Sequence, residues 1–149
     1  MSHAFHQLYY HIIWGTHRRE PVINRTWRPQ LLEIVNAETK NRGGKPIRHN
    51  AMPDHVHLLV RLPPTVALSE FIGQVKGATS YQVNHDIHPD PKLRWQEGYG
   101  VLTLRKGEVS DVSQYIDTQE QHHKAGRLSD LLERLACDED DWLNDDDDA

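Results

Sequence analysis

The sequence predicts an α+β sandwich, in which helices pack on one face of a mostly antiparallel sheet and the other face stays free to bind. Two observations support this fold class. The segments read in the order strand, helix, strand, strand, helix, strand, helix, and no strand is the long apolar run that is typical of a buried parallel strand. At 149 residues, the chain can bury one core without disulfides or a structural metal.

The first two elements follow from side-chain type and spacing. Residues 8–16 (LYYHIIWGT) are apolar, aromatic and β-branched, which predicts a strand. Residues 27–41 place apolar side chains at helical spacing, and Gly43-Gly44 are expected to end this helix.

A β-hairpin is predicted next. Residues 45–52 form its first strand, Pro53-Asp54 its tight turn and residues 55–62 its second strand. Because side chains alternate between the two faces of a strand, His55 and His57 leave the same face. Their place beside a turn, at the beginning of a strand, suggests a surface site that is easy to reach.

The second helix is expected over residues 66–84, on an apolar stripe that begins at Leu68. Gly73 and Gly77 interrupt it at a cost of about 1 kcal/mol each relative to Ala, so close approach of another backbone or of a ligand is expected there, with simple tolerance as the alternative. Residues 93–104 are predicted to form the last strand.

The C-terminal part is expected to hold one helix capped by Ser110 and running to about Lys124, and a short helix over residues 128–136. The domain therefore spans residues 1–136, and residues 137–149 form an acidic, disordered tail. Residues 138–149 carry eight acidic and no basic side chains, so without them the net charge of −5 becomes +3. A solvating role of this tail is favoured over competition for a basic groove on the chain's own body.

The single cysteine, Cys137, excludes an internal disulfide, and no cysteine cluster exists to bind zinc. No apolar run has the length of a membrane span, and the N-terminus lacks the layout of a signal peptide. These features predict a cytoplasmic protein with no membrane partner.

Two motifs carry the candidate chemistry. The first is the pair of histidines in DHVHLLV (residues 54–60), although a chain with 11 histidines contains about one such pair by chance. The second is the helix SDVSQYIDTQEQHHK, in which Tyr115, Gln119 and His122 follow one another along one stripe. The ordinary alternative for Tyr115 is a half-buried ring with its hydroxyl in water.

These motifs, together with Met52-Pro53, VKGATS, WQEGYG and QYIDTQEQHHK, resemble the single-tyrosine HUH transposases of small bacterial insertion sequences, which include the REP-associated tyrosine transposases. The likeness extends from residue 5 to about residue 135. It implies a fold related to the ferredoxin-like and RRM-like sandwich, and a homodimer that binds single-stranded DNA with hairpin ends. It also implies cleavage and rejoining of that DNA through a covalent 5′-phosphotyrosine.

Carried over residue by residue, the resemblance makes Tyr115 the nucleophile and His55, His57 and Gln119 the ligands of a divalent metal. In this family the tyrosine helix can complete the site of the other protomer. Two imidazoles and an amide oxygen suit Mg²⁺ or Mn²⁺ and leave positions open for phosphate oxygens. Asp54 or Glu120 could add charge.

A tyrosine has a reference pKa near 10, so Tyr115 needs a metal or a base such as His122 to lose its proton. The sequence holds no P-loop pattern, and no nucleotide cofactor is expected. DNA phosphates and bases are expected to meet basic and aromatic side chains, each with a surface or core role as its alternative. The candidates are Arg18, Arg19, Lys76, Arg94, Arg105 and Lys106 for phosphates, and Trp14, Trp95 and Tyr99 for stacking.

Two other functions remain open on the sequence. One is a hairpin-binding protein that keeps the fold but does not cleave DNA. The other is a metal hydrolase that uses histidines including His122 and His123 and leaves no protein-bound product.

Overall fold

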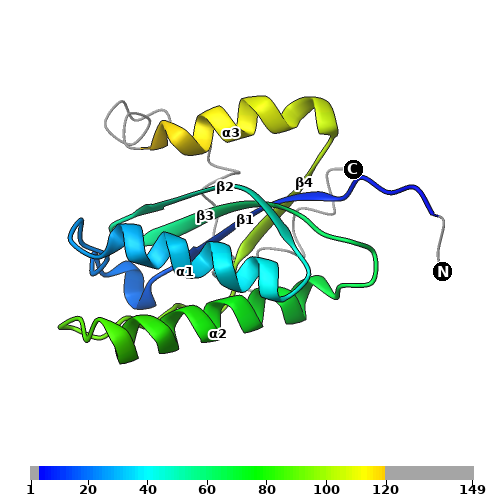
Figure 1. Cartoon of the computed structure of the whole chain (residues 1–149). Coiled ribbons are helices and arrows are strands. Elements are labelled where there is room, and N and C mark those ends of the chain that lie inside the picture. The colour runs from blue at the N-terminus through cyan, green and yellow to red at the C-terminus, as the bar shows by residue number, and fades with distance from the viewer. Residues whose placement is uncertain (1–3, 120–149) are drawn as a thin grey trace, which may run out of the picture.

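The computed structural model describes residues 4–119, which form a four-stranded sheet with three α-helices (Figure 1). The strands lie in the order β2-β3-β1-β4, and each is antiparallel to its neighbours. The bounds are β1 (Tyr9–Gly15), β2 (Lys45–Met52), β3 (His55–Arg61) and β4 (Gly100–Leu104). The predicted α+β class with an antiparallel sheet is confirmed, and the βαββαβ order is that of a ferredoxin-like sandwich.

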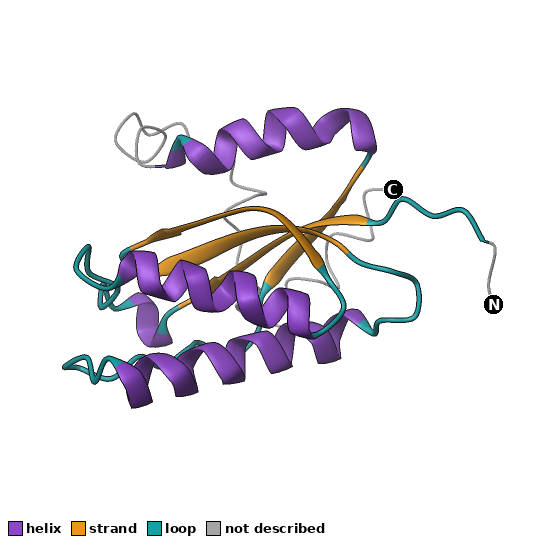
Figure 2. Ribbon diagram, in the orientation of Figure 1, coloured by secondary structure: helices purple, strands orange, loops and turns teal. Residues whose placement is uncertain are grey.

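One face of the sheet is covered by α1 (Arg28–Asn41) and α2 (Leu68–Asp86), which lie side by side (Figure 2). The main core forms here because alternate side chains of β1 and β3 point toward these helices. Those side chains are Ile12, Trp14, Val56, Leu58 and Val60, and all are buried.

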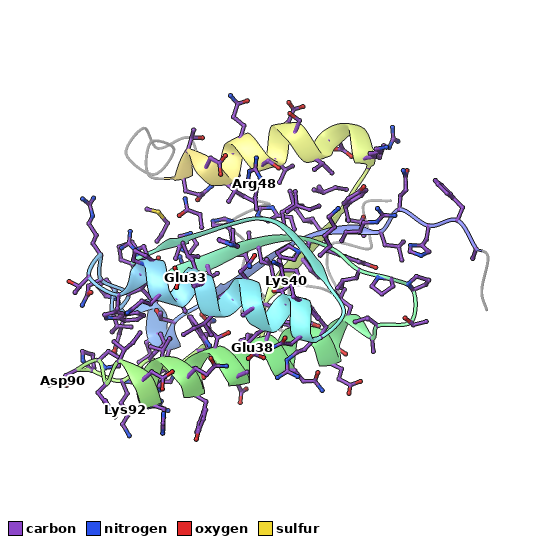
Figure 3. The ribbon with its side chains drawn as sticks, in the orientation of Figure 1. Glu33, Glu38, Lys40, Arg48, Asp90 and Lys92 are labelled. Atoms are coloured by element: carbon purple, nitrogen blue, oxygen red, sulfur yellow. The ribbon has the colours of Figure 1, made fainter. Side chains whose placement is uncertain are left out.

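A buried carboxylate connects the two helices. Glu38 of α1 is 8% exposed, and its Oε1 atom accepts a hydrogen bond of 2.6 Å from Gln82 of α2. Arg42 lies 3.1 Å from its Oε2 atom. Figure 3 labels Glu38 between α1 and α2, where these two partners compensate its burial.

The opposite face of the sheet is not free, contrary to the expectation that all helices pack on one side. The third helix, α3 (Val109–Asp117), crosses it above β2 and β3 (Figure 1). The physical reason is that Ile116 gives α3 an apolar side that needs cover, and this face of the sheet carries further apolar side chains outside the main core. They are Tyr9, Ile13 and Leu59, which are all buried.

The predicted strand over residues 93–104 is too long. Only Gly100–Leu104 belong to the sheet, while Trp95 forms a single bridge with Thr16. Gly98 turns the chain at a φ of +86°, which ends the extended run. The carbonyls of Gln96 and Gly98 accept hydrogen bonds from Lys76 instead of from a strand.

Two smaller expectations are also corrected. A side chain at Gly73 or Gly77 would meet no atom within 4 Å, so no other part of the chain's backbone approaches these glycines closely. Ser110 does not cap α3, because the helix begins at Val109 after a 3-10 turn, η2 (Lys106–Glu108). A second such turn, η1 (His17–Arg19), follows β1.

Several predictions lie outside the described residues. They concern Glu120, His122, His123, the end of the third helix near Lys124, the helix over residues 128–136, Cys137 and the acidic tail. Within residues 4–119, no helix is long and apolar enough to cross a membrane.

Candidate active site

The two histidines of β3 lie on the α3 side of the sheet, as the alternation predicts. Their neighbours Val56 and Leu58 point into the main core, whereas the His57 ring meets Tyr115 of α3. Both imidazoles have 0% exposed surface. The expectation of an easily reached surface site is therefore wrong for this conformation, because α3 covers the strand.

The Nε2 atoms of His55 and His57 converge at a distance of 3.1 Å, with ring centroids 4.9 Å apart. Each outer nitrogen is held by another side chain. His55 Nδ1 lies 2.6 Å from Asp54 Oδ1, and His57 Nδ1 lies 2.9 Å from Nε2 of His11. Two inward-facing nitrogens with both outer nitrogens engaged are the arrangement of metal-binding histidines.

Asp54 is ionised at any ordinary pH. Partial burial alone would raise its pKa, but the hydrogen bond with His55 and the charges of His55 and Arg19 outweigh burial and lower the pKa to about 2. Arg19 makes an ion pair of 3.2 Å with this carboxylate. Since a carboxylate can only accept, His55 Nδ1 donates the hydrogen bond to Asp54, and His55 Nε2 faces His57.

Tyr115 lies on α3 beside this pair. Its ring centroid is 6.2 Å from that of His57 and 6.4 Å from that of His11, and both contacts are edge to face. The ring is half-buried. The structure thus brings Tyr115 and His57, 58 positions apart in the sequence, together within one chain.

Two contacts hold the end of α3 over the histidines. The side chain of Asn50 donates a hydrogen bond of 2.8 Å to the carbonyl of Ile116, and Asn50 is the cross-strand partner of His57. Arg48, labelled in Figure 3 on the α3 side of β2, lies 3.5 Å from Asp117. Asn50 was not among the residues predicted from the sequence, where its one signal was a polar amide inside a predicted strand.

Gln119 follows α3 and is fully buried. Its Nε2 atom donates to the carbonyl of Tyr115 at 3.2 Å, while its Oε1 atom has no hydrogen-bond partner within residues 4–119. A buried carbonyl oxygen without a donor is a costly group that a cation would satisfy. Imidazole nitrogens and an amide oxygen are donor types that suit Mg²⁺ or Mn²⁺.

In the described part of the chain, no group of three His, Cys, Asp or Glu side chains is arranged to bind a metal ion. Among residues 4–119, a third protein ligand would therefore have to be of another type, and the amide of Gln119 is such a group. Carboxylates are absent from this set, which predicts weak affinity in the free protein.

The side chains that were predicted to contact DNA lie on both faces of the sheet. Lys76 lies on α2, across the sheet from the histidines, and donates to Gln96 and Gly98 carbonyls at 2.9 and 2.8 Å. Burial lowers its pKa, against the opposing charge of Glu97. Arg18 and Arg94 line a small hollow of about 270 Å³ beside η1.

Of the three rings expected to stack on bases, Trp14 is 1% exposed and packs edge to face on Trp95, so it cannot meet a base. Trp95 is partly buried and donates to the carbonyl of Lys76 at 2.8 Å. Tyr99 also packs against the core.

A larger basic hollow lies on the α3 side of the sheet. This hollow, the α3 groove, has a volume of about 680 Å³ and is lined by Lys45, Arg48, Arg61 and Lys106. Arg61 and Lys45 are cross-strand partners, and Arg61 also lies over the ring of Tyr9. Of these four cations, only Lys106 was predicted to contact DNA. The other three were not predicted, because they come together through strand pairing that no local sequence pattern specifies.

The comparisons with known proteins agree with this architecture. The sequence model of the family described as "Transposase IS200 like" matches residues 4–119. The ISDra2 transposase TnpA of Deinococcus radiodurans is 29% identical over 120 residues, which are 76% of this chain and 85% of that protein. The transposase for insertion sequence element IS200 of Salmonella typhimurium is 24% identical over 132 residues, which are 85% of this chain and 86% of that protein.

Two solved structures are also similar. The crystal structure of a proposed transposase from Deinococcus radiodurans has a TM-score of 0.64 and 27% identity, covering 80% of this chain and 95% of that one. A REP-associated tyrosine transposase bound to a REP hairpin has a TM-score of 0.57 and 15% identity, covering 83% of this chain and 74% of that one. At that identity the second likeness shows the fold alone.

Proposed function

Since the chain belongs to the IS200-like transposase family and is a DNA transposase, we propose that it cleaves and rejoins single-stranded DNA with Tyr115 as the nucleophile. The resemblance inferred from the motifs is confirmed at the level of the family. The observation that carries the proposal is the position of the Tyr115 ring, 6.2 Å from the His57 ring whose Nε2 converges with that of His55.

The proposed reaction is an exchange of phosphodiester bonds. The Tyr115 phenol gives up its proton, its oxygen bonds to the scissile phosphorus, and the 3′ oxygen leaves and takes up a proton. The products are a DNA 5′-phosphate esterified to Tyr115 and a free 3′-hydroxyl on the other fragment. Because the number of ester bonds is conserved, another 3′-hydroxyl can reverse the step and join a new strand without ATP.

His55, His57 and Gln119 would hold a divalent cation, Mg²⁺ or Mn²⁺, beside Tyr115. Such a cation, when bound, polarises the scissile phosphate and helps to align it for in-line attack. The residues of this chain fix the geometry, since Asp54 and His11 engage the outer imidazole nitrogens and Asn50 positions α3.

We propose that the α3 groove binds the phosphates of the strand that leads to this site. Arg61 lies on the same strand and the same face as His57, four residues further, which corresponds to about 13 Å. A few nucleotides of a single strand span this distance. By likeness to the relative solved with a REP hairpin, the proposed substrate is a single strand with hairpin ends.

A covalent adduct tests the proposed reaction. The protein is incubated with Mn²⁺ and a hairpin-ended oligonucleotide that carries one dye at each end, and the products are separated under denaturing conditions. The proposal expects the dye of the 3′ fragment to migrate with the protein, because that fragment carries the 5′-phosphate. Two free DNA fragments without a protein-bound product would indicate a hydrolase and contradict the proposal.

The complete burial of both imidazoles supports a second candidate function, a hairpin-binding protein that does not cleave. In this conformation a DNA phosphate cannot reach the histidines unless α3 shifts. Hairpin binding without any adduct, in the presence of Mg²⁺ as well as Mn²⁺, would favour this candidate.

Loss of two groove cations is expected to weaken DNA binding without changing the fold. Lys45 and Lys106 are exposed, so the double variant Lys45→Ala, Lys106→Ala removes two phosphate contacts. The slope of log affinity against log salt for a single strand should fall by about 1.4, that is about 0.7 for each contact. Fluorescence anisotropy at several salt concentrations measures this slope.

Lys40→Ala is the matched control, because Lys40 is an exposed lysine on α1, on the far side of the sheet (Figure 3). Its salt slope should equal that of the unsubstituted protein. An unchanged slope in the double variant would place the DNA elsewhere.

The proposed homodimer raises the question of which protomer supplies the tyrosine. In the structure, Asn50 docks α3 on its own sheet, which predicts action in cis. A mixture of a Tyr115→Phe protein with a His57→Gln protein should then form no adduct, since neither chain has a complete site. Recovery of the adduct in the mixture would show that the tyrosine helix is exchanged between protomers.

A further inference from the structure

We propose that His11 is a positioning residue that orients the imidazole of His57 for the binding of a cation. The inference deepens the proposed function, on which it rests, because it concerns the same site. His11 was not among the residues that the sequence singled out.

The position of His11 is fixed by strand register. His11 of β1 pairs with Leu59, and His57 pairs with Ile13, so the two histidines are diagonal neighbours on the α3 side of the sheet. His11 is 1% exposed. An imidazole inside an apolar strand is costly to bury unless its nitrogens are engaged, which suggests that it serves a purpose other than packing.

Two contacts hold the two rings together. His11 Nε2 lies 2.9 Å from His57 Nδ1, and the rings stack with centroids 5.1 Å apart and planes inclined by 25°. The hydrogen bond fixes the direction of the His57 ring, and the stacking restricts its rotation. Both contacts leave His57 Nε2 directed at His55.

The hydrogen bonds give the two β3 histidines equivalent surroundings. Asp54 engages the outer nitrogen of His55, and His11 engages the outer nitrogen of His57. In each case the hydrogen bond at Nδ1 holds the ring so that its Nε2 atom points away from the partner, toward the position at which a cation would bind. Without His11, only the ring of His55 would be oriented in this way, by Asp54.

The proton position on His57 decides whether the pair can bind a cation. With its proton on Nδ1, His57 donates to His11, and two Nε2 lone pairs face one point. With its proton on Nε2, His57 donates to Nε2 of His55, so neither Nε2 atom has a lone pair available for a cation. His11 is compatible with both forms, because its Nε2 atom can accept a hydrogen bond from His57 Nδ1 or donate one to it, and binding of a cation requires the first form.

Two substitutions of His11 separate hydrogen bonding from packing. His11→Phe fills the space but cannot accept a hydrogen bond. His11→Gln can place its Oε1 atom near the position of the imidazole Nε2 atom and accept from His57. His49→Phe is the control, because His49 is a half-buried histidine on β2 whose partner, Leu58, points into the main core.

The test measures binding of Mn²⁺ alone to the full chain, without DNA, from the electron paramagnetic resonance signal of the free ion. We expect His11→Phe to weaken the affinity by about 10- to 100-fold, the range for partners that orient metal-binding histidines. His11→Gln should recover most of the affinity, and His49→Phe should leave it unchanged. Unaltered affinity in His11→Phe, or an equal loss in His11→Gln, would overturn the inference.

A measurement on the unsubstituted protein keeps the inference testable if His11→Phe does not fold. In ¹⁵N-labelled protein, magnetic coupling between His57 Nδ1 and His11 Nε2 should appear across their hydrogen bond, and its absence would overturn the inference.

The two proposals can fail independently. A loss of Mn²⁺ affinity in a protein that forms no DNA adduct would support the role of His11 and contradict the proposed reaction. An adduct in a protein whose Mn²⁺ affinity is unchanged by His11→Phe would support the proposed reaction and contradict the role of His11.

Discussion

Replacement of Tyr115 by phenylalanine should abolish the covalent DNA adduct. Phenylalanine keeps the ring and its edge contacts with His11 and His57 but lacks the oxygen that bonds to phosphorus. Denaturing electrophoresis with a dye-labelled hairpin oligonucleotide and Mn²⁺ measures the adduct.

Tyr81→Phe is the matched control, because Tyr81 is 68% exposed on α2, on the other side of the sheet. It should form the adduct at the rate of the unsubstituted protein. The thermal unfolding and the hairpin affinity of Tyr115→Phe should also stay unchanged, since the ring remains in place. An adduct of undiminished yield in Tyr115→Phe would show that the nucleophile is another residue.

Replacement of His57 by alanine should slow adduct formation by at least about 100-fold. The variant loses one of the two converging Nε2 atoms, and a bound cation contributes several kcal/mol to the stabilisation of a reacting phosphate. It should also weaken Mn²⁺ binding, and excess Mn²⁺ should restore part of the rate. Both quantities are measured over a range of Mn²⁺ concentrations.

The truncation also leaves a buried cavity, so the stability of His57→Ala must be measured by denaturant unfolding and the rates compared where both proteins are folded. His49→Ala is the control, since it removes a histidine from the neighbouring strand on the opposite face. An adduct rate in His57→Ala equal to that of the control at limiting Mn²⁺ would refute the proposed role of His57.

The sheet and its hairpin could be predicted because their determinants are local. The period of two in DHVHLLV and the turn at Pro53-Asp54 specify a strand, its faces and its partner. The same period predicts that His55 and His57 share a face. Residues 93–99 were wrongly predicted to be part of a strand, because Trp95 and Tyr99 are residue types that are common in strands. The local path of the chain is instead determined by Gly98 and by the hydrogen bonds of the Lys76 ammonium group.

The rest of the site depends on contacts between distant segments. His11 meets His57 only because β1 and β3 pair in one register, and a register shift by one residue would move His11 to the other face. Asn50 and the cations of the α3 groove depend likewise on how β2 and α3 meet. The proximity of Tyr115 to the histidines could be expected only from the family resemblance, since no rule of spacing relates positions so far apart.

The proposed reaction requires that His55, His57 and Gln119 surround one cation beside Tyr115. Anomalous diffraction from a crystal soaked in Mn²⁺ tests it most directly. We expect one ion bound by Nε2 of His55, Nε2 of His57 and Oε1 of Gln119, with the hydroxyl of a Tyr115 nearby. An ion bound elsewhere, or a Tyr115 remote from both imidazoles in every chain of the assembly, would contradict it.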